Sequence, residues 1–513
     1  MTESRTKKSI RNSIVALGFF FLNLLLQFFF RKVFIDHLGV AVLGLNTTAT
    51  NLLQFLNLAE LGIGVAVAST LYKPLFNNDS KTINEIVSLQ GWLYRNIAFF
   101  IIIGSVILML FFPIIFSKIE IPLWYAYATY SVLLFSALLG YFANYKQIVL
   151  SASQQDYKIQ FSYRLPLLIK VLVEIFAINY FSNGYIWWLA IEVAFSIVAC
   201  ISLTFTIKRT FPQLHTNASL GKILKAKYPD VSRKIKQVFF HKIGSYALTQ
   251  ASPLIIYAYS SLGTVAIYGN YFLITNGISV LVSSVFNSMG AGIGNLIAQG
   301  DRPRILKVFD EIFTLRFALA STLCAALILF GQIFIIIWVG NQYLFEMKTL
   351  ILMTIICYVS MTRNTVDSYL NGYGLFKDIW SPLAEAVINL SLSALLGYRY
   401  GINGVLAGII ISQIVIILGW KPFFLFHYGF KISIRSYWAL NFKCFMTMLL
   451  SGTVVYICGL SIEYSIYDIS FSNIAKGVGI FSIYILVSFL LLYLFTTGFK
   501  NGIKRISILI LNR

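Results

Sequence analysis

Long apolar runs recur along the whole of this chain and constrain its fold more than any other feature. About 20 consecutive apolar residues let a helix cross the roughly 30 Å hydrocarbon core of a bilayer, and 58% of the 513 residues are hydrophobic. Only helices satisfy their own backbone hydrogen bonds within one such run. We therefore predict an all-α integral membrane protein with about fourteen transmembrane helices. The expected spans are 13–34, 41–70, 91–116, 121–150, 160–181, 185–207, 239–258, 265–298, 313–338, 347–371, 379–398, 403–427, 440–460 and 476–497.

The positive charges lie mainly in alternate gaps between these runs. If the N-terminus is cytoplasmic, the inside segments hold 32 of the 40 Lys and Arg residues and the outside segments hold 6. Lys170 and Arg363 complete the set and fall within spans. Cations beside a span resist translocation, so both termini are predicted to be cytoplasmic. The net charge of +21 is therefore mainly a topology signal, and nucleic acid is not an expected partner.

The polar segments divide the chain into four parts. The longest is an inside segment near 208–238, and no outside loop exceeds about 15 residues, which leaves no room for a soluble catalytic domain. We expect an N-terminal lobe of helices 1 to 6 over 1–207, a basic cytoplasmic linker over 208–238 and a C-terminal lobe of helices 7 to 12 over 239–430. Helices 13 and 14 and a cytoplasmic tail then occupy 431–513.

An internal repeat supports two lobes of six helices each. In the first lobe, Leu38-Gly39 is followed by Gly44, by Gly62-Ile63-Gly64 and by Asp79. In the second lobe, Leu262-Gly263 is followed by Gly269, by Gly292-Ile293-Gly294 and by Asp301. Six spans separate the two copies, so the repeat is parallel, and two lobes that face each other would leave a cavity between them.

Charged residues inside spans are candidates for a polar interior, because each costs about 2.5 to 3.5 kcal/mol at a helix centre. Arg164, Lys170 and Glu174 lie close together in the fifth span, and Arg363 and Asp367 share the tenth. Lys170 with Glu174 and Arg363 with Asp367 have the four-residue spacing of helical ion pairs. Each pair either neutralises itself and pins helices together or lines an aqueous path.

The other candidates are single charges. Glu60 has no cation at helical spacing, as is also true of Glu192 and Glu385. An unpaired buried carboxylate tends to take up a proton or bind a cation, unless it reaches a partner on another helix. Arg31 and Arg95 stand at span ends, where they either snorkel toward lipid phosphates or meet an anionic headgroup.

Motifs of enzymatic chemistry are absent from the sequence. It has no HExxH zinc motif, no phosphate-binding Gly-x-x-x-x-Gly-Lys-Ser/Thr loop and no Gly-x-Gly-x-x-Gly turn. The five cysteines are scattered through apolar spans without a CxxC pair. We therefore expect no catalytic residue, no metal site and no direct use of ATP, and the protein is not predicted to be an enzyme.

Several short motifs resemble a known family. They are Arg31, Leu38-Gly39, Gly44, Glu60-Leu61-Gly62, Lys73-Pro74-Leu75 and Tyr400-Gly401-Ile402-Asn403-Gly404-Val405. These residues, with the number and order of spans, resemble the Wzx-type polysaccharide (O-antigen or capsule) flippases of the multidrug/oligosaccharidyl-lipid/polysaccharide exporter superfamily.

The resemblance implies two six-helix lobes in a V shape plus two C-terminal helices, in a bacterial inner membrane. It also implies a flippase that moves undecaprenyl-pyrophosphate-linked oligosaccharides to the outer leaflet, driven by a proton or sodium gradient and without a bound cofactor. Membrane lipids, a polysaccharide polymerase and chain-length machinery would be further partners. On this reading the headgroup or lumen candidates are Arg31, Arg95, Arg164, Lys170 and Arg363, and the ion-coupling candidates are Glu60, Glu174 and Asp367.

Two transporters and one enzyme class compete with this interpretation. A multidrug exporter of the same superfamily would be expected to have twelve spans and a less cationic interior. A lipid II flippase would also have fourteen spans and a cationic cavity, with more arginine in its first two helices than this chain carries. A membrane polymerase or ligase would need a sizeable outside loop, and none is visible in the sequence.

Overall fold

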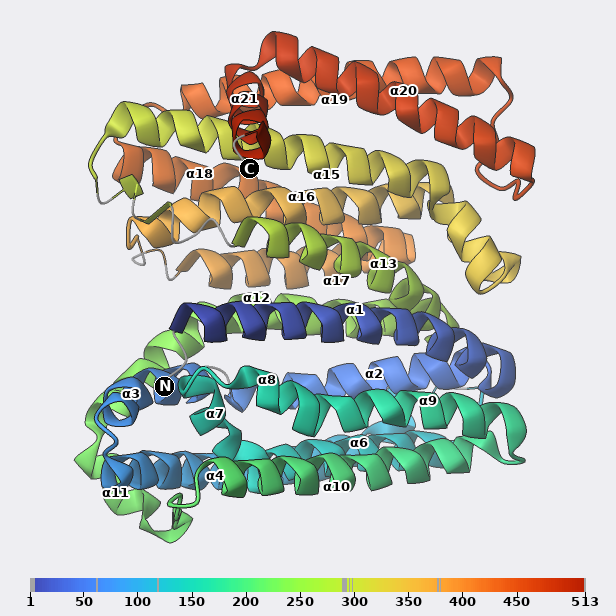
Figure 1. Ribbon diagram of the computed structural model, residues 1–513. Coiled ribbons are helices and arrows are strands. Elements are labelled where there is room, and N and C mark those ends of the chain that lie inside the picture. The colour runs from blue at the N-terminus through green and yellow to red at the C-terminus, as the bar shows by residue number, and fades with distance from the viewer. Residues whose placement is uncertain are drawn as a thin grey trace. The chain divides into compact units, whose positions relative to one another are not determined.

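The computed structural model describes residues 5–511 apart from 61–62, 118–119, 288–292, 295, 298, 376–377 and 379. Gly62 and Gly292 of the repeat motif lie outside the described residues. The described part of the chain is helical, joined by short turns, and it contains no strand (Figure 1). The prediction of an all-α protein is therefore confirmed.

The chain forms two compact units, Met1–Ala266 and Ile267–Arg513. The long helices of the first unit run side by side (Figure 1). Its α-helices are α1 (Arg5–Leu38), α2 (Val40–Leu56), α3 (Ile63–Phe76), α4 (Ser80–Leu110), α5 (Phe112–Ile115), α6 (Trp124–Phe142), α7 (Ile148–Ala152), α8 (Asp156–Ile159), α9 (Leu165–Tyr180), α10 (Gly184–Thr210), α11 (Gly221–Lys227) and α12 (Pro229–Tyr259).

The second unit is built on α15, a helix of 37 residues. The unit buries an apolar cluster around Phe309, Phe313 and Phe317 of this helix. Its helices are α13 (Leu262–Asn287), which begins in the first unit, α15 (Arg302–Trp338), α16 (Met347–Gly372), α17 (Trp380–Gln413), α18 (Lys421–Phe424), α19 (Arg435–Ser461), α20 (Phe471–Phe495) and α21 (Thr497–Leu511).

Ten helices of the described chain are long and apolar enough to cross a membrane. One of them, over 380–430, covers two expected spans. Gly401 lies between these two spans and has a non-helical backbone, with φ 55° and ψ −137°. The other three expected spans correspond to the region of α2 and α3, to α9 and to α12. The helices thus fit the predicted arrangement of about fourteen.

The second span is not the continuous helix that its apolar run predicted. The α-helix ends at Leu56, a 3₁₀ turn follows over Asn57–Glu60, and α3 begins at Ile63. The interruption places the Glu60 carboxylate at the junction of two helices.

The segment over 208–238 is folded against α4. Gly221 approaches Trp92 so closely that an added Cβ would lie 2.1 Å from the side chain, and Lys227 Nζ donates to Glu85 Oε2 at 2.6 Å. That hydrogen bond raises the pKa of Lys227. Farther along the chain, α12 packs on α2 and α3, so the first compact unit extends to Ala266. The lobe boundaries expected from the repeat remain a prediction.

Equivalent aspartates of the repeat begin equivalent helices. Asp79 accepts a hydrogen bond from the Thr82 backbone N–H at the start of α4, and Asp301 accepts one from the Arg304 backbone N–H at the start of α15. A side chain in this position satisfies an otherwise unpaired helical N–H group. Both aspartates also have nearly the same backbone angles, with φ −79° and ψ 83° at Asp79 and φ −74° and ψ 87° at Asp301.

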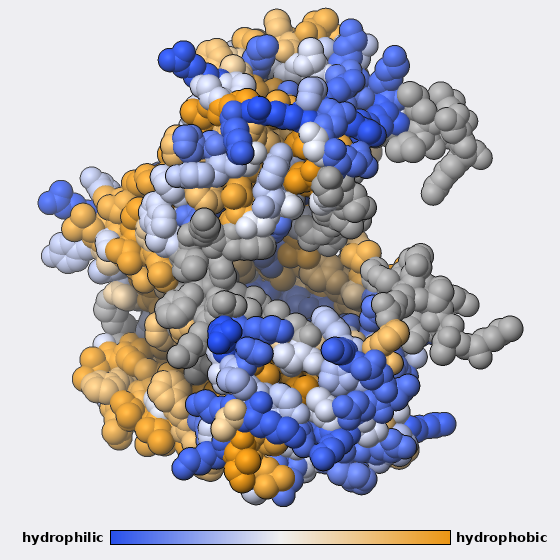
Figure 2. Space-filling model, turned by 90° about the vertical axis from the view of Figure 1, so that its left-hand side faces the viewer, coloured by the Kyte–Doolittle hydropathy of each residue, from blue (hydrophilic) through white to orange (hydrophobic). Residues whose placement is uncertain are grey.

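Large apolar side chains are exposed on helices of both units. Ile201 and Phe205 of α10 are 63% and 66% exposed, and Leu486 and Leu494 of α20 are 70% and 64% exposed. Hydrophilic residues instead gather at one end of the helices, which Figure 2 views end on. An apolar surface of this extent suits lipid rather than water. The protein is a multi-pass membrane protein.

Candidate functional site

A hairpin of two helices brings charged side chains together in the first unit. Asn183 adopts the left-handed conformation at φ 62° and ψ 43°, which Asn tolerates better than most residues, and it lets α10 fold back along α9. Lys170 of α9 thereby lies opposite Glu192 of α10. The Lys170 ammonium donates to Glu192 Oε2 at 2.6 Å, and the two side chains are only 15% and 12% exposed.

Glu174 lies beside this ion pair, one helical turn after Lys170. It is 2% exposed, and its Oε1 atom has no hydrogen-bond partner among the described residues. Its carboxyl interacts electrostatically with both Lys170 and Glu192. The sequence predicted a pair of Lys170 with Glu174, whereas the hydrogen-bonded partner is Glu192, because the antiparallel helix presents that acid directly to the lysine. We call Lys170, Glu174 and Glu192 the unit 1 cluster.

Glu60 is held by two tyrosines instead of a cation. The Tyr94 hydroxyl donates to Oε1 at 2.8 Å and the Tyr141 hydroxyl donates to Oε2 at 2.9 Å. The two rings meet edge to face with centroids 5.6 Å apart, so α4 and α6 fix both donors. Each carboxylate oxygen of Glu60 therefore has a partner on another helix. This was one of the two alternatives that the sequence left open, the other being that Glu60 takes up a proton or binds a cation.

The second unit holds a larger network of charges. Arg363 Nε lies 3.2 Å from Asp367 Oδ2 on the same helix, α16, which confirms the spacing argument. Lys421 Nζ of α18 donates to Asp367 Oδ1 at 2.8 Å, and Arg363 Nη1 lies 4.0 Å from Glu385 Oε1 of α17. Three helices thus contribute to one network of two cations and two acids.

Arg316 of α15 adds a third cation to this network. Its side chain is 2% exposed, and its guanidinium carbon lies 4.3 Å from the centre of the Phe286 ring. Asp367 attracts it electrostatically, but its Nε and Nη1 atoms are buried and meet no hydrogen-bond acceptor in the described part of the chain. We call Arg316, Arg363, Asp367, Glu385 and Lys421 the unit 2 cluster. With its acids ionised, it carries one excess positive charge.

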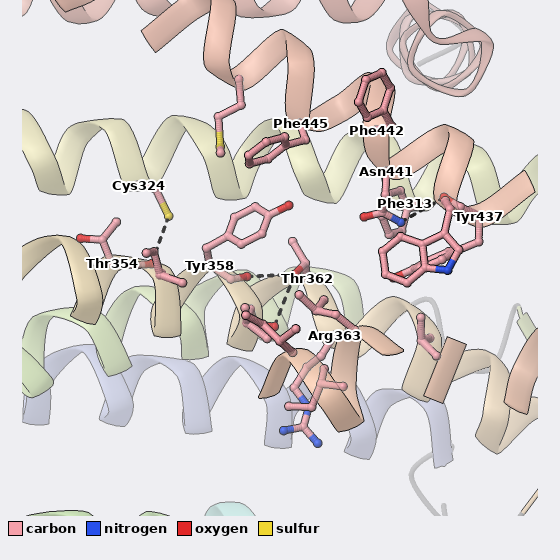
Figure 3. Close-up of a pocket in the computed structure, with 18 of the residues that line it drawn as sticks. Phe313, Cys324, Thr354, Tyr358, Thr362, Arg363, Tyr437, Asn441, Phe442 and Phe445 are labelled. Atoms are coloured by element: carbon pink, nitrogen blue, oxygen red, sulfur yellow. Dashed lines mark hydrogen bonds between the residues drawn. The ribbon is translucent and has the colours of Figure 1, made fainter. Parts of the chain in front are cut away.

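An apolar cavity of about 660 Å³ adjoins the unit 2 cluster. Helices α15, α16 and α19 and the π-helical segment Ile414–Trp420 form its walls, and Arg363 lines it. Figure 3 shows Phe442 and Phe445 on one side of the cavity and Arg363 on the other, with its guanidinium pointing away from α19. A second cavity of about 500 Å³ shares Cys324, Ile328 and Met448 with the first and continues along α15 toward α20.

The remaining sequence candidates lie outside both clusters. Arg31 Nη2 donates to the backbone carbonyl of Ala266 at 3.2 Å. The side chains of Arg95 and Arg164 are exposed. The structure thus brings Lys170 together with Glu174 and brings Arg363 together with Asp367, whereas Glu60, Arg31, Arg95 and Arg164 are each placed separately.

The sequence did not identify two members of the unit 2 cluster. Arg316 and Lys421 stand near the ends of expected spans, where cations indicate topology. Their burial depends on the direction in which each helix turns its side chains, which no spacing in the sequence reveals. Glu192 and Glu385 were noted only as isolated acids, because their partners lie on neighbouring helices.

Comparisons with known proteins relate this geometry to transporters. No protein-family model matches the chain, and no curated protein matches it in sequence. A solved structure of the lipid II flippase MurJ, in an inward closed conformation, is similar over 95% of this chain and 98% of that chain, with a TM-score of 0.63 and 16% identity. An inward-facing multidrug resistance MATE family transporter of the MOP superfamily is similar over 80% of this chain and 97% of that chain, with a TM-score of 0.56 and 13% identity. The chain therefore has the fold that these two structures share.

Proposed function

We propose that this protein is a Wzx-type flippase that moves undecaprenyl-pyrophosphate-linked oligosaccharide units from the inner to the outer leaflet for surface polysaccharide biosynthesis. The fold supports transport, since MurJ is described as a lipid II flippase and the MATE protein as a multidrug resistance transporter. The sequence motifs quoted above support the polysaccharide branch.

The excess positive charge of the unit 2 cluster beside an apolar cavity is the observation that carries this proposal. A pyrophosphate is anionic and polar, whereas its polyprenyl chain is apolar, so a carrier must offer both environments. Arg363 belongs to the cluster and also lines the cavity. Guanidinium groups match phosphate oxygens with parallel hydrogen bonds. Arg363 is therefore our principal headgroup candidate, with Lys421 and Arg316 supplying further positive charge.

The driving force in this proposal is an ion gradient coupled to alternating access, with no bound cofactor. Glu60, Glu174 and Asp367 stay the coupling candidates, and Arg31, Arg95, Arg164 and Lys170 stay secondary lumen candidates. The proposed location is a bacterial inner membrane with both termini in the cytoplasm. Polysaccharide polymerase and chain-length machinery are the proposed protein partners, because they would consume the flipped units.

Two alternative cargoes fit the same fold. Lipid II also carries a pyrophosphate on a polyprenyl chain, so the unit 2 cluster would suit it equally well. A cationic drug would be repelled by the excess positive charge of that cluster, which disfavours a multidrug exporter.

Transport assays with the full-length protein in liposomes distinguish these cargoes. The probes are undecaprenyl-pyrophosphate-linked oligosaccharide, lipid II and a fluorescent cationic drug, each tested with an imposed proton or sodium gradient. We expect the oligosaccharide to reach the opposite leaflet several times faster than either other probe. Protein-free liposomes and the Lys348→Ala variant are the controls, because Lys348 is an exposed side chain paired with Glu346. Faster movement of lipid II or of the drug would contradict the proposal.

A further inference from the structure

The unit 1 cluster contains more acid than its buried setting can hold in ionised form. Glu174 is 2% exposed and Glu192 is 9% exposed, and both face the single ammonium of Lys170. If both acids were ionised, the cluster would carry one uncompensated negative charge. An isolated buried ion costs several kcal/mol even after the protein relaxes, and two neighbouring carboxylates commonly avoid this cost by sharing a proton.

Arg31 and Arg164 are not among the charged groups that act on Glu174. Arg31 of α1 directs a guanidinium N–H to the Ala266 carbonyl, and Arg164, next to α9, has an exposed side chain. The neighbouring helix α6 contains no charged residue. Tyr163 interacts with Lys170, but the charged groups that act on Glu174 are Lys170 and Glu192.

We propose that Glu174 and Glu192 bind one proton between them at neutral pH, beside the Lys170 ammonium, and that this is the proton-coupling site of the transporter. The coupling role rests on the proposed function, whereas the proton site itself does not. The proton comes from water and converts one carboxylate to a carboxylic acid, which leaves the cluster neutral. Its release leaves the cluster with one negative charge, so loading and release change the energy of burying this hairpin.

The local atoms favour a proton over a sodium ion. Hard metal cations take several oxygen ligands, and the Lys170 ammonium already occupies Glu192 Oε2 at 2.6 Å. A sodium ion bound to the same carboxylates would lie next to this ammonium and be repelled by it. The unpartnered Oε1 atom of Glu174 needs only a single hydrogen.

The other acid sites differ from this one in their partners. Glu60 has a tyrosine hydroxyl on each oxygen, and the carboxyls of Asp367 and Glu385 face an excess of cations. Among these acids, Glu174 is the one that combines near-complete burial with an oxygen that meets no donor in the described chain.

Infrared spectroscopy of the purified full-length protein in lipid tests the proton site without any transport substrate. A protonated buried carboxyl gives a C=O stretching band distinct from that of a carboxylate. We expect this component at neutral pH in the wild type and its loss in Glu174→Gln, where Glu192 alone pairs with Lys170. The component should also be lost in Glu192→Gln, where Glu174 becomes the counter-ion of Lys170.

Two further variants complete the test. Lys170→Gln removes the counter-ion and should about double the protonated component, because both carboxyls then become neutral. Glu346→Gln, which changes an exposed acid paired with Lys348, should leave the component unchanged. The wild-type band should also disappear on alkaline titration, a measurement that requires no variant to fold.

Three results would overturn parts of this proposal. An unchanged protonated component in both Glu174→Gln and Glu192→Gln shows that no proton is held there. A shift of the carboxylate bands by sodium at constant pH, with no protonated component, replaces the proton by a metal cation. A confirmed proton site in a protein that moves no lipid-linked probe under a proton gradient leaves the site standing and contradicts the transport function.

Discussion

The two charged clusters use the same spacing of residues but differ in charge balance, because ionised acids outnumber the cation in unit 1 and cations outnumber the acids in unit 2. In each, an acid follows the cation by four residues and a second acid follows it by 22, as Lys170, Glu174 and Glu192 in one unit and as Arg363, Asp367 and Glu385 in the other. The unit 1 lysine bonds to the more distant acid at 2.6 Å. The unit 2 arginine instead lies closer to the near acid, 3.2 Å against 4.0 Å.

The difference arises from cations that neighbouring helices add. Lys421 of α18 occupies the second oxygen of Asp367, and Arg316 of α15 lies near it, so the unit 2 cluster has a surplus of positive charge. In the unit 1 cluster, Lys170 is the cation that acts on both acids. Under our proposals, one spacing pattern gives an anion site in unit 2 and a proton site in unit 1, depending on the cations that the adjacent helices contribute.

Removing the acid that lies four residues after the cation, Asp367 in unit 2 or Glu174 in unit 1, should change the free energy of unfolding very unequally. This is the largest difference that we expect between the two clusters. Asp367→Asn leaves Lys421, Arg363 and Arg316 without their common acid, which should lower the free energy of unfolding by about 3 to 5 kcal/mol. Glu174→Gln replaces a neutral acid by a neutral amide under our proposal and should change it by less than about 1 kcal/mol. Denaturant unfolding of the two variants in the same lipid measures both values. Similar losses of unfolding free energy in the two variants would show that the clusters do not differ in charge balance.

Replacing Arg316 by an apolar side chain separates stability from function. Arg316→Met removes a buried cation whose Nε and Nη1 atoms meet no acceptor among the described residues, and an ion buried without good partners costs several kcal/mol. We expect unchanged or increased stability together with slower transport of lipid-linked oligosaccharide, because the excess charge of the unit 2 cluster is lost. The same unfolding experiment and the liposome assay give the two readings. A destabilised variant with normal transport would assign Arg316 a structural role alone.

The smallest expected effect concerns Glu60, which belongs to neither cluster. Tyr94→Phe removes the hydroxyl that donates to Glu60 Oε1 at 2.8 Å. A hydrogen bond to a charged group contributes about 1.5 kcal/mol, so the free energy of unfolding should fall by that amount. Tyr141→Phe should cost a similar amount, since it removes the donor to Oε2. The double variant measured by unfolding should lose more than either single one. No loss in any of the three would mean that these tyrosines do not stabilise the Glu60 carboxylate.

The sequence predicted the membrane helices well because burial in lipid depends mainly on the composition of each run. It placed the charges of α9 and α16 within apolar helices for the same reason. It missed the break after Leu56, because an apolar run continues through the 3₁₀ turn at Asn57–Glu60. It missed the roles of Arg316 and Lys421 because the direction of a side chain around a helix axis is set by tertiary packing. The C-terminal helix α21 was expected only as a tail, although Gly498 and Gly502 pack it closely against α15.

Binding of undecaprenyl pyrophosphate to the full-length protein in lipid nanodiscs tests the anion site of unit 2 most directly. Arg363→Gln removes the cation that belongs to both the cluster and the cavity, and losing its charge-assisted hydrogen bonds, worth about 1.5 to 3 kcal/mol, should weaken binding roughly 10-fold to 100-fold. The control variant Lys348→Gln, which changes an exposed cation outside both clusters, should bind as the wild type does. Equal affinity of Arg363→Gln and the wild type would contradict the assignment of the headgroup site to unit 2.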